Sequence, residues 1–167
     1  IGGSAAGEVA SHLAVSKLRE AFLKAPVFKK DSQVNDWIHD TLNKANDAIY
    51  LESMRNRKER GMGTTCVGMI YANNATYIFN VGDSRLYAYY SDGLIQMSED
   101  HSVIAKLIKE GKIKPEEAKR HAQRNTLTNA LGVWRVFPIY TNKIDLNYRY
   151  IFICSDGLHG FVSYEEN

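Results

Sequence analysis

The chain has 167 residues, of which 44% are hydrophobic and 24% are charged, values typical of one soluble globular domain. Its 21 basic and 19 acidic residues leave a net charge of +2. This small charge excludes the strong positive field by which proteins attract nucleic acids or membrane surfaces. The sequence has no apolar stretch that spans a bilayer and no signal-peptide pattern, so we expect a cytoplasmic protein with no nucleic-acid or membrane partner.

The first third of the chain predicts two amphipathic helices. After a Gly-rich start, apolar residues recur at three-to-four spacing over residues 8–23, and the pattern stops near Pro26. A second apolar stripe follows, and either Asp31 or Ser32 is expected to cap its helix. We therefore expect a helical pair over about residues 8–58.

From residue 64 the apolar pattern changes to a period of two, which is typical of strands. The residues Asn73, Asn74 and Gly93 fall between consecutive runs, and Asn and Gly tolerate the left-handed conformations of tight hairpin turns. The pattern therefore predicts an antiparallel meander. Its strands, with two more near the end of the chain, are expected at 64–72, 76–81, 86–90, 94–98, 137–146 and 148–154.

A helical insert is expected at about residues 102–121, between the two groups of strands. A short helix over 103–108 ends near Gly111, and Pro115 suits an early position of the next helix. An insert of this kind serves either as a mobile flap over a site or as passive packing, and the sequence alone leaves both interpretations open.

Two acidic residues follow buried strands directly. Asp83 lies in the motif at 82–85, Gly-Asp-Ser-Arg, and Asp156 lies in the motif at 155–157, Ser-Asp-Gly. A strand that holds the backbone and a turn that points the side chain outward fix a carboxylate in place, as a metal site requires. An Asp in a turn after a strand also forms without any metal, so turn capping is the alternative interpretation.

The other reactive residue types point to structural roles. Cys66 and Cys154 fall inside strand-like runs without any Cys or His spacing typical of zinc sites, so we expect reduced thiols. His101 has the chemistry of an acid, base or ligand, but we expect it to be structural, in the link to the helical insert. Arg85 is expected to pair with an internal carboxylate, for which Asp83 is a candidate.

Six short motifs occur in order along the chain, and together they resemble the metal-dependent protein Ser/Thr phosphatases of the protein phosphatase 2C type (the PPM family), in their bacterial form. The resemblance covers essentially all 167 residues. It implies an α+β fold, a four-layer α-β-β-α sandwich with antiparallel sheets. The motifs are Gly2-Gly3-Ser4-Ala5-Ala6-Gly7-Glu8, Met62-Gly63-Thr64-Thr65, Val81-Gly82-Asp83-Ser84-Arg85, Asp100-His101-Ser102, Asn125-Thr126-Leu127-Thr128-Asn129-Ala130-Leu131-Gly132 and Cys154-Ser155-Asp156-Gly157-Leu158.

The resemblance also implies a reaction. Two Mn²⁺ or Mg²⁺ ions activate a water that attacks the phosphorus of phosphoserine or phosphothreonine in a protein, so no side chain is expected to act as the nucleophile. Asp156 matches a ligand of the binuclear centre, and Asp83 matches an Asp that in similar proteins helps to hold a third, weaker ion. A cognate Ser/Thr kinase is the expected counterpart in signal transduction.

The sequence departs from the family pattern at both ends. Similar enzymes begin with Asp-Gly-x-Gly-Gly, whose Asp bridges both metals, whereas this chain begins at x with Ile1, and the downstream Asp-Asn motif is absent. Milder changes are Ser4 in place of a frequent His and Asn129 in place of a frequent Arg. We therefore expect residues 1–167 to be an internal fragment of a phosphatase domain, incomplete at both termini and impaired in activity.

Three alternatives stay open at this stage. The first is a non-catalytic pseudophosphatase of the same fold that acts as a regulatory binding module. The second keeps the metal chemistry but directs it at small phosphorylated regulator proteins of bacterial signalling switches, instead of a broad reversal of Ser/Thr kinases. The third is an unrelated all-β binding protein. The retained carboxylates Asp83 and Asp156 favour the enzyme.

Overall fold

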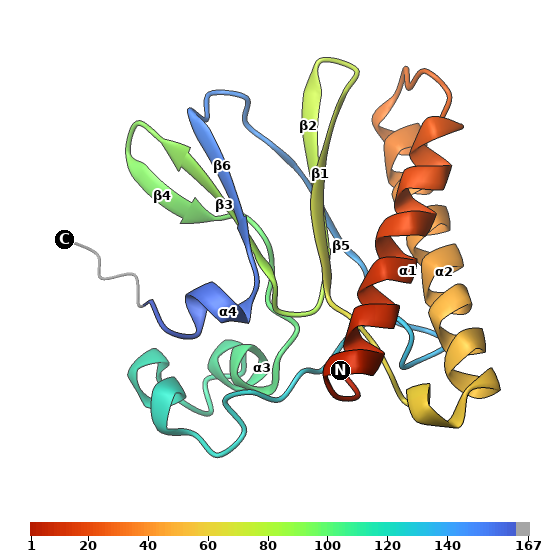
Figure 1. The fold of residues 1–167 in the computed structure, drawn as a ribbon. Helices are drawn as coiled ribbons and strands as arrows, with labels where there is room; N and C mark the ends of the chain where they lie inside the picture. Colours follow the sequence, from red (N-terminus) through yellow and green to blue (C-terminus); the bar gives the residue numbers. More distant parts are fainter. Residues whose placement is uncertain (163–167) are drawn as a thin grey trace.

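The computed structural model of the protein describes residues 1–162, which form one helical layer and two antiparallel sheets (Figure 1). The first sheet contains β1 (Cys66–Ala72), β2 (Ala75–Val81) and β5 (Tyr140–Ile144), in the order β1-β2-β5. The second contains β3 (Arg85–Tyr90), β4 (Gly93–Gln96) and β6 (Tyr150–Cys154), in the order β4-β3-β6. The predicted α+β class with antiparallel sheets is confirmed.

Helices α1 (Ser4–Leu23) and α2 (Asp31–Arg55) lie side by side and cover the first sheet, and a short 3₁₀ turn, η1 (Arg57–Glu59), follows them (Figure 1). Helix α1 begins four residues before the periodic pattern that predicted it. Small residues at four-residue spacing on α1 and large apolar residues on α2 share one core. These buried residues are Ala6, Ala10 and Ala14 on α1 and Val34, Ile38, Leu42, Ala45 and Ile49 on α2.

The expected cap of the second helix was wrong by one residue. Lys30, in an extended conformation, is the N-cap of α2, and Asp31 is the first helical residue. The Asp31 carboxylate instead accepts a hydrogen bond from the Tyr77 hydroxyl of β2 and lies 3.2 Å from Lys143 Nζ of β5. The acidic residue is therefore used to attach the start of α2 to the first sheet.

The predicted meander is wrong at the junction between β2 and β3, because these consecutive strands belong to different sheets. The chain turns at Gly82, whose φ of +104° lies in the region that favours glycine. A Cβ atom at this position would stand 2.5 Å from Cγ2 of Thr65, so a side chain has no room. The hairpins β1–β2 and β3–β4 form as predicted, with Asn73 and Asn74 at positive φ in the first turn.

Strand β2 is the central strand of the first sheet, and all of its residues are buried. One face, with Tyr77 and Phe79, packs in the core shared with the helices, while Ile78 belongs to a second core between the sheets. The outer face of the second sheet exposes Tyr150 and Phe152. Of the four layers that the family resemblance implies, residues 1–162 contain the α1–α2 layer and the two sheets (Figure 1).

Residues 102–127, which we call the flap, extend from one end of the two sheets (Figure 1). The flap holds α3 (Val103–Lys109) and η2 (Pro115–Arg120), and an isolated bridge between Ser102 and Leu127 closes its base. The Ser102 hydroxyl caps α3 by accepting from the Ala105 amide at 3.1 Å. The helix expected from Pro115 is a 3₁₀ helix.

Two further features concern the cysteines and the helices. Cys66 and Cys154 are both free, and desolvation raises the pKa of the Cys66 thiol to about 12. Among residues 1–162, no helix combines the length and the hydrophobicity needed to cross a membrane.

Candidate active site

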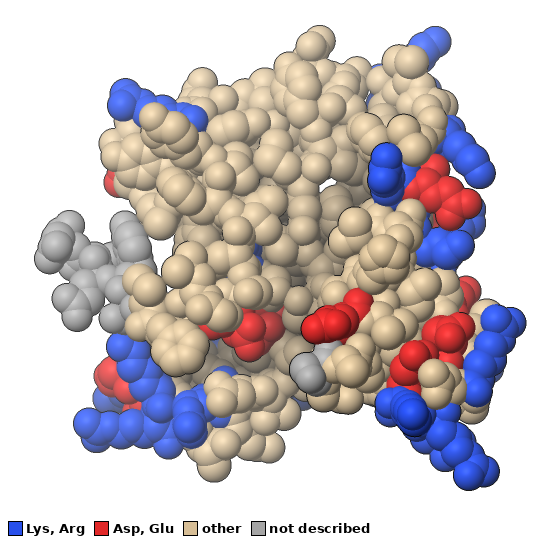
Figure 2. Space-filling model, viewed as in Figure 1, with Lys and Arg blue, Asp and Glu red and all other residues tan. Residues whose placement is uncertain are grey.

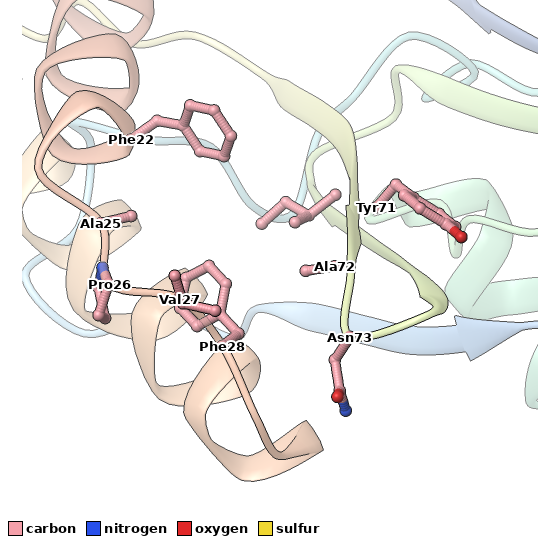
Figure 3. Close-up of a pocket in the computed structure, with 9 residues that line it drawn as sticks. Phe22, Ala25, Pro26, Val27, Phe28, Tyr71, Ala72 and Asn73 are labelled. Carbon is pink, nitrogen blue, oxygen red and sulfur yellow. The ribbon is translucent and has the colours of Figure 1, made fainter.

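Two hollows lie at opposite ends of the first sheet, and they differ in their chemistry. A pocket of about 260 Å³ between the α1–α2 turn and the β1–β2 hairpin is lined by apolar groups such as Phe22 and Val27, and none of its lining side chains is charged (Figure 3). A cleft of about 1420 Å³ at the other end is bordered by the β2–β3 turn, the β6–α4 junction and the flap. The charged groups that suit phosphate chemistry line this cleft, which is therefore the candidate site.

The register of β3 and β6 brings the two predicted acidic residues to this cleft. Arg85 at the start of β3 pairs with Cys154 at the end of β6, in antiparallel orientation. Asp83 lies two residues before Arg85, and Asp156 lies two residues after Cys154, at the start of α4 (Asp156–His159). The same end of the same strand pair thus carries both carboxylates, and both line the cleft.

The electrostatics of Asp83 reflect this proximity. Partial burial raises the pKa of the Asp83 carboxyl, the negative charge of Asp156 raises this pKa further, and His159 acts in the opposite direction. His159 Nε2 also lies 2.9 Å from the backbone oxygen of Asp83, which ties α4 to the β2–β3 turn. A cation bound beside Asp83 would offset the negative charge of Asp156 that disfavours ionisation of the Asp83 carboxyl.

The donor chemistry of this pair fits Mn²⁺ or Mg²⁺, because hard divalent cations prefer oxygen ligands. The number of donors is smaller than a full coordination shell. Among the residues that the structure describes, no group of three or more His, Cys, Asp and Glu side chains lies close enough to hold a metal ion. Asp83 and Asp156 therefore fit as two members of a larger ligand set, which water or other oxygen donors would complete.

Arg85 pairs with an internal carboxylate, as expected, but this carboxylate is Asp100 and not the candidate Asp83. Its Nε lies 3.0 and 3.1 Å from the two carboxylate oxygens of Asp100, and its Nη2 donates to Oδ2 at 2.7 Å. Gln96 donates to the same carboxylate at 2.8 Å, and Tyr87 accepts from Arg85 Nη1 at 3.0 Å. Burial by itself lowers the pKa of Arg85, but the bonds to Asp100 outweigh it and raise this pKa, so the guanidinium stays charged.

His101 has the structural role that the sequence predicted, in the link to the flap. Its Nδ1 accepts a hydrogen bond from the Gly82 amide at 3.0 Å, and the His101 amide donates to the Gly82 carbonyl at 2.9 Å. The buried Asn129 points its Nδ2 at the same ring nitrogen, at 3.1 Å. Burial lowers the pKa of His101. The base of the flap is thereby joined to the turn that presents Asp83.

Sequence reasoning missed two groups at the cleft. His159 had no spacing typical of a ligand, and its place beside Asp83 follows only from the β3–β6 register. The basic residues Lys119 and Arg124 of the flap also line the cleft. The high density of basic residues in the insert was the one signal available in the sequence. This signal does not tell which of the basic residues face the cleft.

Comparison with known proteins shows the family of the chain. The family model for protein phosphatase 2C matches residues 2–107. The serine/threonine phosphatase stp of Listeria monocytogenes serotype 4b is 36% identical over 163 residues, which is 97% of this chain and 65% of that protein. The chain therefore spans slightly less than two thirds of the length of this relative.

Solved structures give the same result. The serine/threonine phosphatase Stp1 of Staphylococcus aureus matches with a TM-score of 0.86 and 35% identity, over 93% of this chain and 61% of that one. The catalytic domain of the phosphatase PstP, solved in complex with two manganese ions, matches with a TM-score of 0.78 and 30% identity, over 98% of this chain and 66% of that one. This chain thus belongs to the protein phosphatase 2C family.

Proposed function

We propose that residues 1–167 form part of one protein phosphatase 2C-type domain, and that the protein hydrolyses phosphoserine and phosphothreonine in other proteins. The observation that carries the proposal is the convergence of Asp83 and Asp156 at a charged cleft, within a fold shared with bacterial Ser/Thr phosphatases. The substrates are phosphoproteins made by a Ser/Thr kinase, with no nucleic-acid or membrane partner. We place the reaction in the cytoplasm, where the free thiols Cys66 and Cys154 would stay reduced.

Asp156 and Asp83 are proposed to hold Mn²⁺ or Mg²⁺. Asp156 belongs to the pair of catalytic ions, and Asp83 to a third, weaker ion, as the family resemblance implies. Such ions, when bound, acidify a water molecule and neutralise charge on phosphoryl oxygens. The residues of the chain itself fix the geometry: the β3–β6 ladder sets the spacing of the two carboxylates, and the His159 contact holds α4 against the turn at Asp83.

Arg85 and Asp100 are positioning residues in this proposal. Arg85 donates to Asp100 through Nε and Nη2 and to Tyr87 through Nη1, and these contacts fix the orientation of its guanidinium. Its role is to anchor the segment that leads from β4 into the flap, and so to hold one wall of the cleft next to the two carboxylates.

A non-catalytic pseudophosphatase is the second candidate, and one observation favours it. The described residues hold no three-donor metal cluster, so residues 1–167 alone are proposed to bind the ions weakly and to turn over slowly. A regulatory module of this kind would bind phosphoproteins or other partners without hydrolysis. Metal binding and hydrolysis separate the two candidates.

The test uses the full natural protein, together with whatever sequence flanks these residues. We expect release of inorganic phosphate from a phosphothreonine peptide, dependent on Mn²⁺ and abolished by EDTA. Asp156→Asn should lower kcat/KM by at least about 100-fold, since even outer-shell changes at metal sites cost 10–100-fold. Asp92→Asn, in the exposed β3–β4 turn, is the matched control and should have no effect. A folded protein that binds Mn²⁺ weakly in calorimetry and releases no phosphate would move the pseudophosphatase to first place.

A further inference from the structure

Positive charge is concentrated in the flap. Residues 102–127 contain seven lysines and arginines and three glutamates, whereas the net charge of the whole chain is +2. The flap therefore holds more net positive charge than the molecule as a whole. In the space-filling view, blue side chains gather over the part of the surface where the flap lies in Figure 1, beside the central hollow (Figure 2).

Three of the seven flap cations line the cleft, and none of the flap's acidic residues does. Lys109, Lys119 and Arg124 line the cleft, whereas none of the three flap glutamates is among its lining residues. Glu110 is neutralised by Lys112 at 2.7 Å, and Glu117 is occupied as an acceptor from the backbone at the start of η2. The wall that the flap contributes to the cleft is therefore basic.

Two of these cations are available to a ligand. Within residues 1–162, neither Lys119 nor Arg124 forms a salt bridge, and both side chains are exposed. Lys109 makes only a long contact with Glu99, at 3.9 Å, with its side chain 78% exposed. Asp83 and Asp156 line the same cleft, so it offers carboxylates to cations and flap cations to anions.

We propose that the flap selects phosphorylated sites flanked by acidic residues, with Lys119 and Arg124 binding the flanking carboxylates. The proposal rests on the proposed function and adds its substrate class. An extended peptide advances about 3.3 Å per residue, so a carboxylate two or three residues from the phosphorylated one lies about 7–10 Å away from it. The Debye length is about 8 Å at physiological ionic strength, so a flanking carboxylate is attracted to Lys119 or Arg124 when the peptide brings it within about this distance.

The expected size of the effect follows from the exposure of the side chains. Ion pairs between exposed groups usually change an affinity by about 1.5-fold to fivefold each, and salt weakens them. Two such pairs predict a preference of about twofold to 25-fold for an acidic peptide over a neutral one. The preference should decrease between about 50 and 500 mM salt, because screening is stronger at higher ionic strength.

The experiment compares phosphothreonine peptides that are identical except for glutamate or glutamine at the flanking positions. With the full natural protein and Mn²⁺, we would measure kcat/KM for each peptide and, by fluorescence anisotropy, the Kd of each labelled peptide. An aryl phosphate serves as a control substrate that is too small to reach the flap. The variant K119E/R124E should remove the preference for glutamate and leave aryl phosphate hydrolysis unchanged. The control K106E/R120E changes the charge of the flap equally at exposed positions that do not line the cleft, and should keep the preference.

The outcomes separate the two proposals. Equal kcat/KM and equal Kd for both peptides in the wild type, or an equal loss in the control variant, would overturn the role of the flap. A protein that hydrolyses neither the aryl phosphate nor the peptides refutes the proposed function. In that case the Kd values still decide about the flap, because binding of an acidic peptide to Lys119 and Arg124 does not require turnover.

Discussion

The contact between Arg85 and Asp100 is the structural link most open to a quantitative test. It joins the first residue of β3 to the segment that enters the flap, at one wall of the cleft. The change Asp100→Asn removes the charge while it keeps the shape of the side chain. It also replaces one acceptor oxygen by an amide group, so a donor faces the guanidinium wherever Arg85 retains its position.

The magnitude follows from the burial of the pair. The side chains of Arg85 and Asp100 are 28% and 14% exposed, between a surface pair and a buried one. A surface pair contributes about 0–1 kcal/mol, and removal of one partner from a buried pair costs about 3–5 kcal/mol. We therefore expect Asp100→Asn to lower the free energy of unfolding by about 2 kcal/mol, which corresponds to a decrease in Tm of about 4–8 °C for a domain of this size.

A double-mutant cycle in urea isolates the contact. Arg85→Met keeps much of the apolar stem of the side chain and removes the guanidinium. The double variant should be less destabilised than the sum of the single ones, with a coupling of about 1–2 kcal/mol. The control is Glu20→Gln, which breaks the exposed contact of Glu20 with Lys17 at 3.4 Å and should change stability by less than about 0.5 kcal/mol.

Two results would refute this reasoning. If the two single changes add within about 0.5 kcal/mol, Arg85 and Asp100 do not stabilise each other in solution. If Asp100→Asn costs no more than Glu20→Gln, the hydrogen bonds to the Asp100 carboxylate are offset by the loss of its hydration.

Two further predictions concern ionisation. Folding raises the pKa of Asp83, so the ionised carboxylate destabilises the folded protein above that pKa. The variant Asp83→Asn should therefore stabilise the metal-free protein at pH 7 by about 0.5 kcal/mol, after allowance for solvent screening. The same variant should bind Mn²⁺ more weakly in calorimetry. A lower Tm of this variant in EDTA would contradict the prediction. Because folding lowers the pKa of His101, its contribution to stability is complete above about pH 6.5 and decreases as the pH falls toward the folded pKa. Urea titrations between pH 7 and pH 5 should show this loss of stability, since a protonated Nδ1 would face the Gly82 amide. The variant His101→Gln should lose less stability over the same pH range. An unchanged dependence of stability on pH in this variant would exclude His101 as the cause.

Much of the local structure was predictable, because the periodicity of apolar residues reports which face of an element is buried. The three-to-four spacing located α1 and α2, and the alternation from residue 64 located the hairpins β1–β2 and β3–β4. The turn chemistry of Asn73 and Asn74 was read correctly, since their positive φ values depend on the residues themselves. The order of short motifs identified the family, which needs no structure.

The predictions were wrong or incomplete where a strand or a side chain could pair with more than one partner. Alternation shows that β2 and β3 are strands, but it contains no information on whether they pair, and in the fold they belong to different sheets. The sequence predicted an internal carboxylate as the partner of Arg85 and offered Asp83, two residues away, as a candidate, whereas the fold supplies Asp100, 15 residues away. Contacts of this kind depend on how strands and loops meet in space.

The sequence by itself thus determined the elements, their buried faces, the family and the two candidate carboxylates Asp83 and Asp156. The tertiary structure alone decided that these carboxylates lie at one end of one strand pair, through the register in which Arg85 pairs with Cys154. It alone also brought Lys109, Lys119 and Arg124 of the flap to the same cleft as these carboxylates. The physical reason is that periodicity is a property of neighbours along the chain, whereas register and electrostatic surroundings are set by residues that are distant in sequence and meet only in the folded protein.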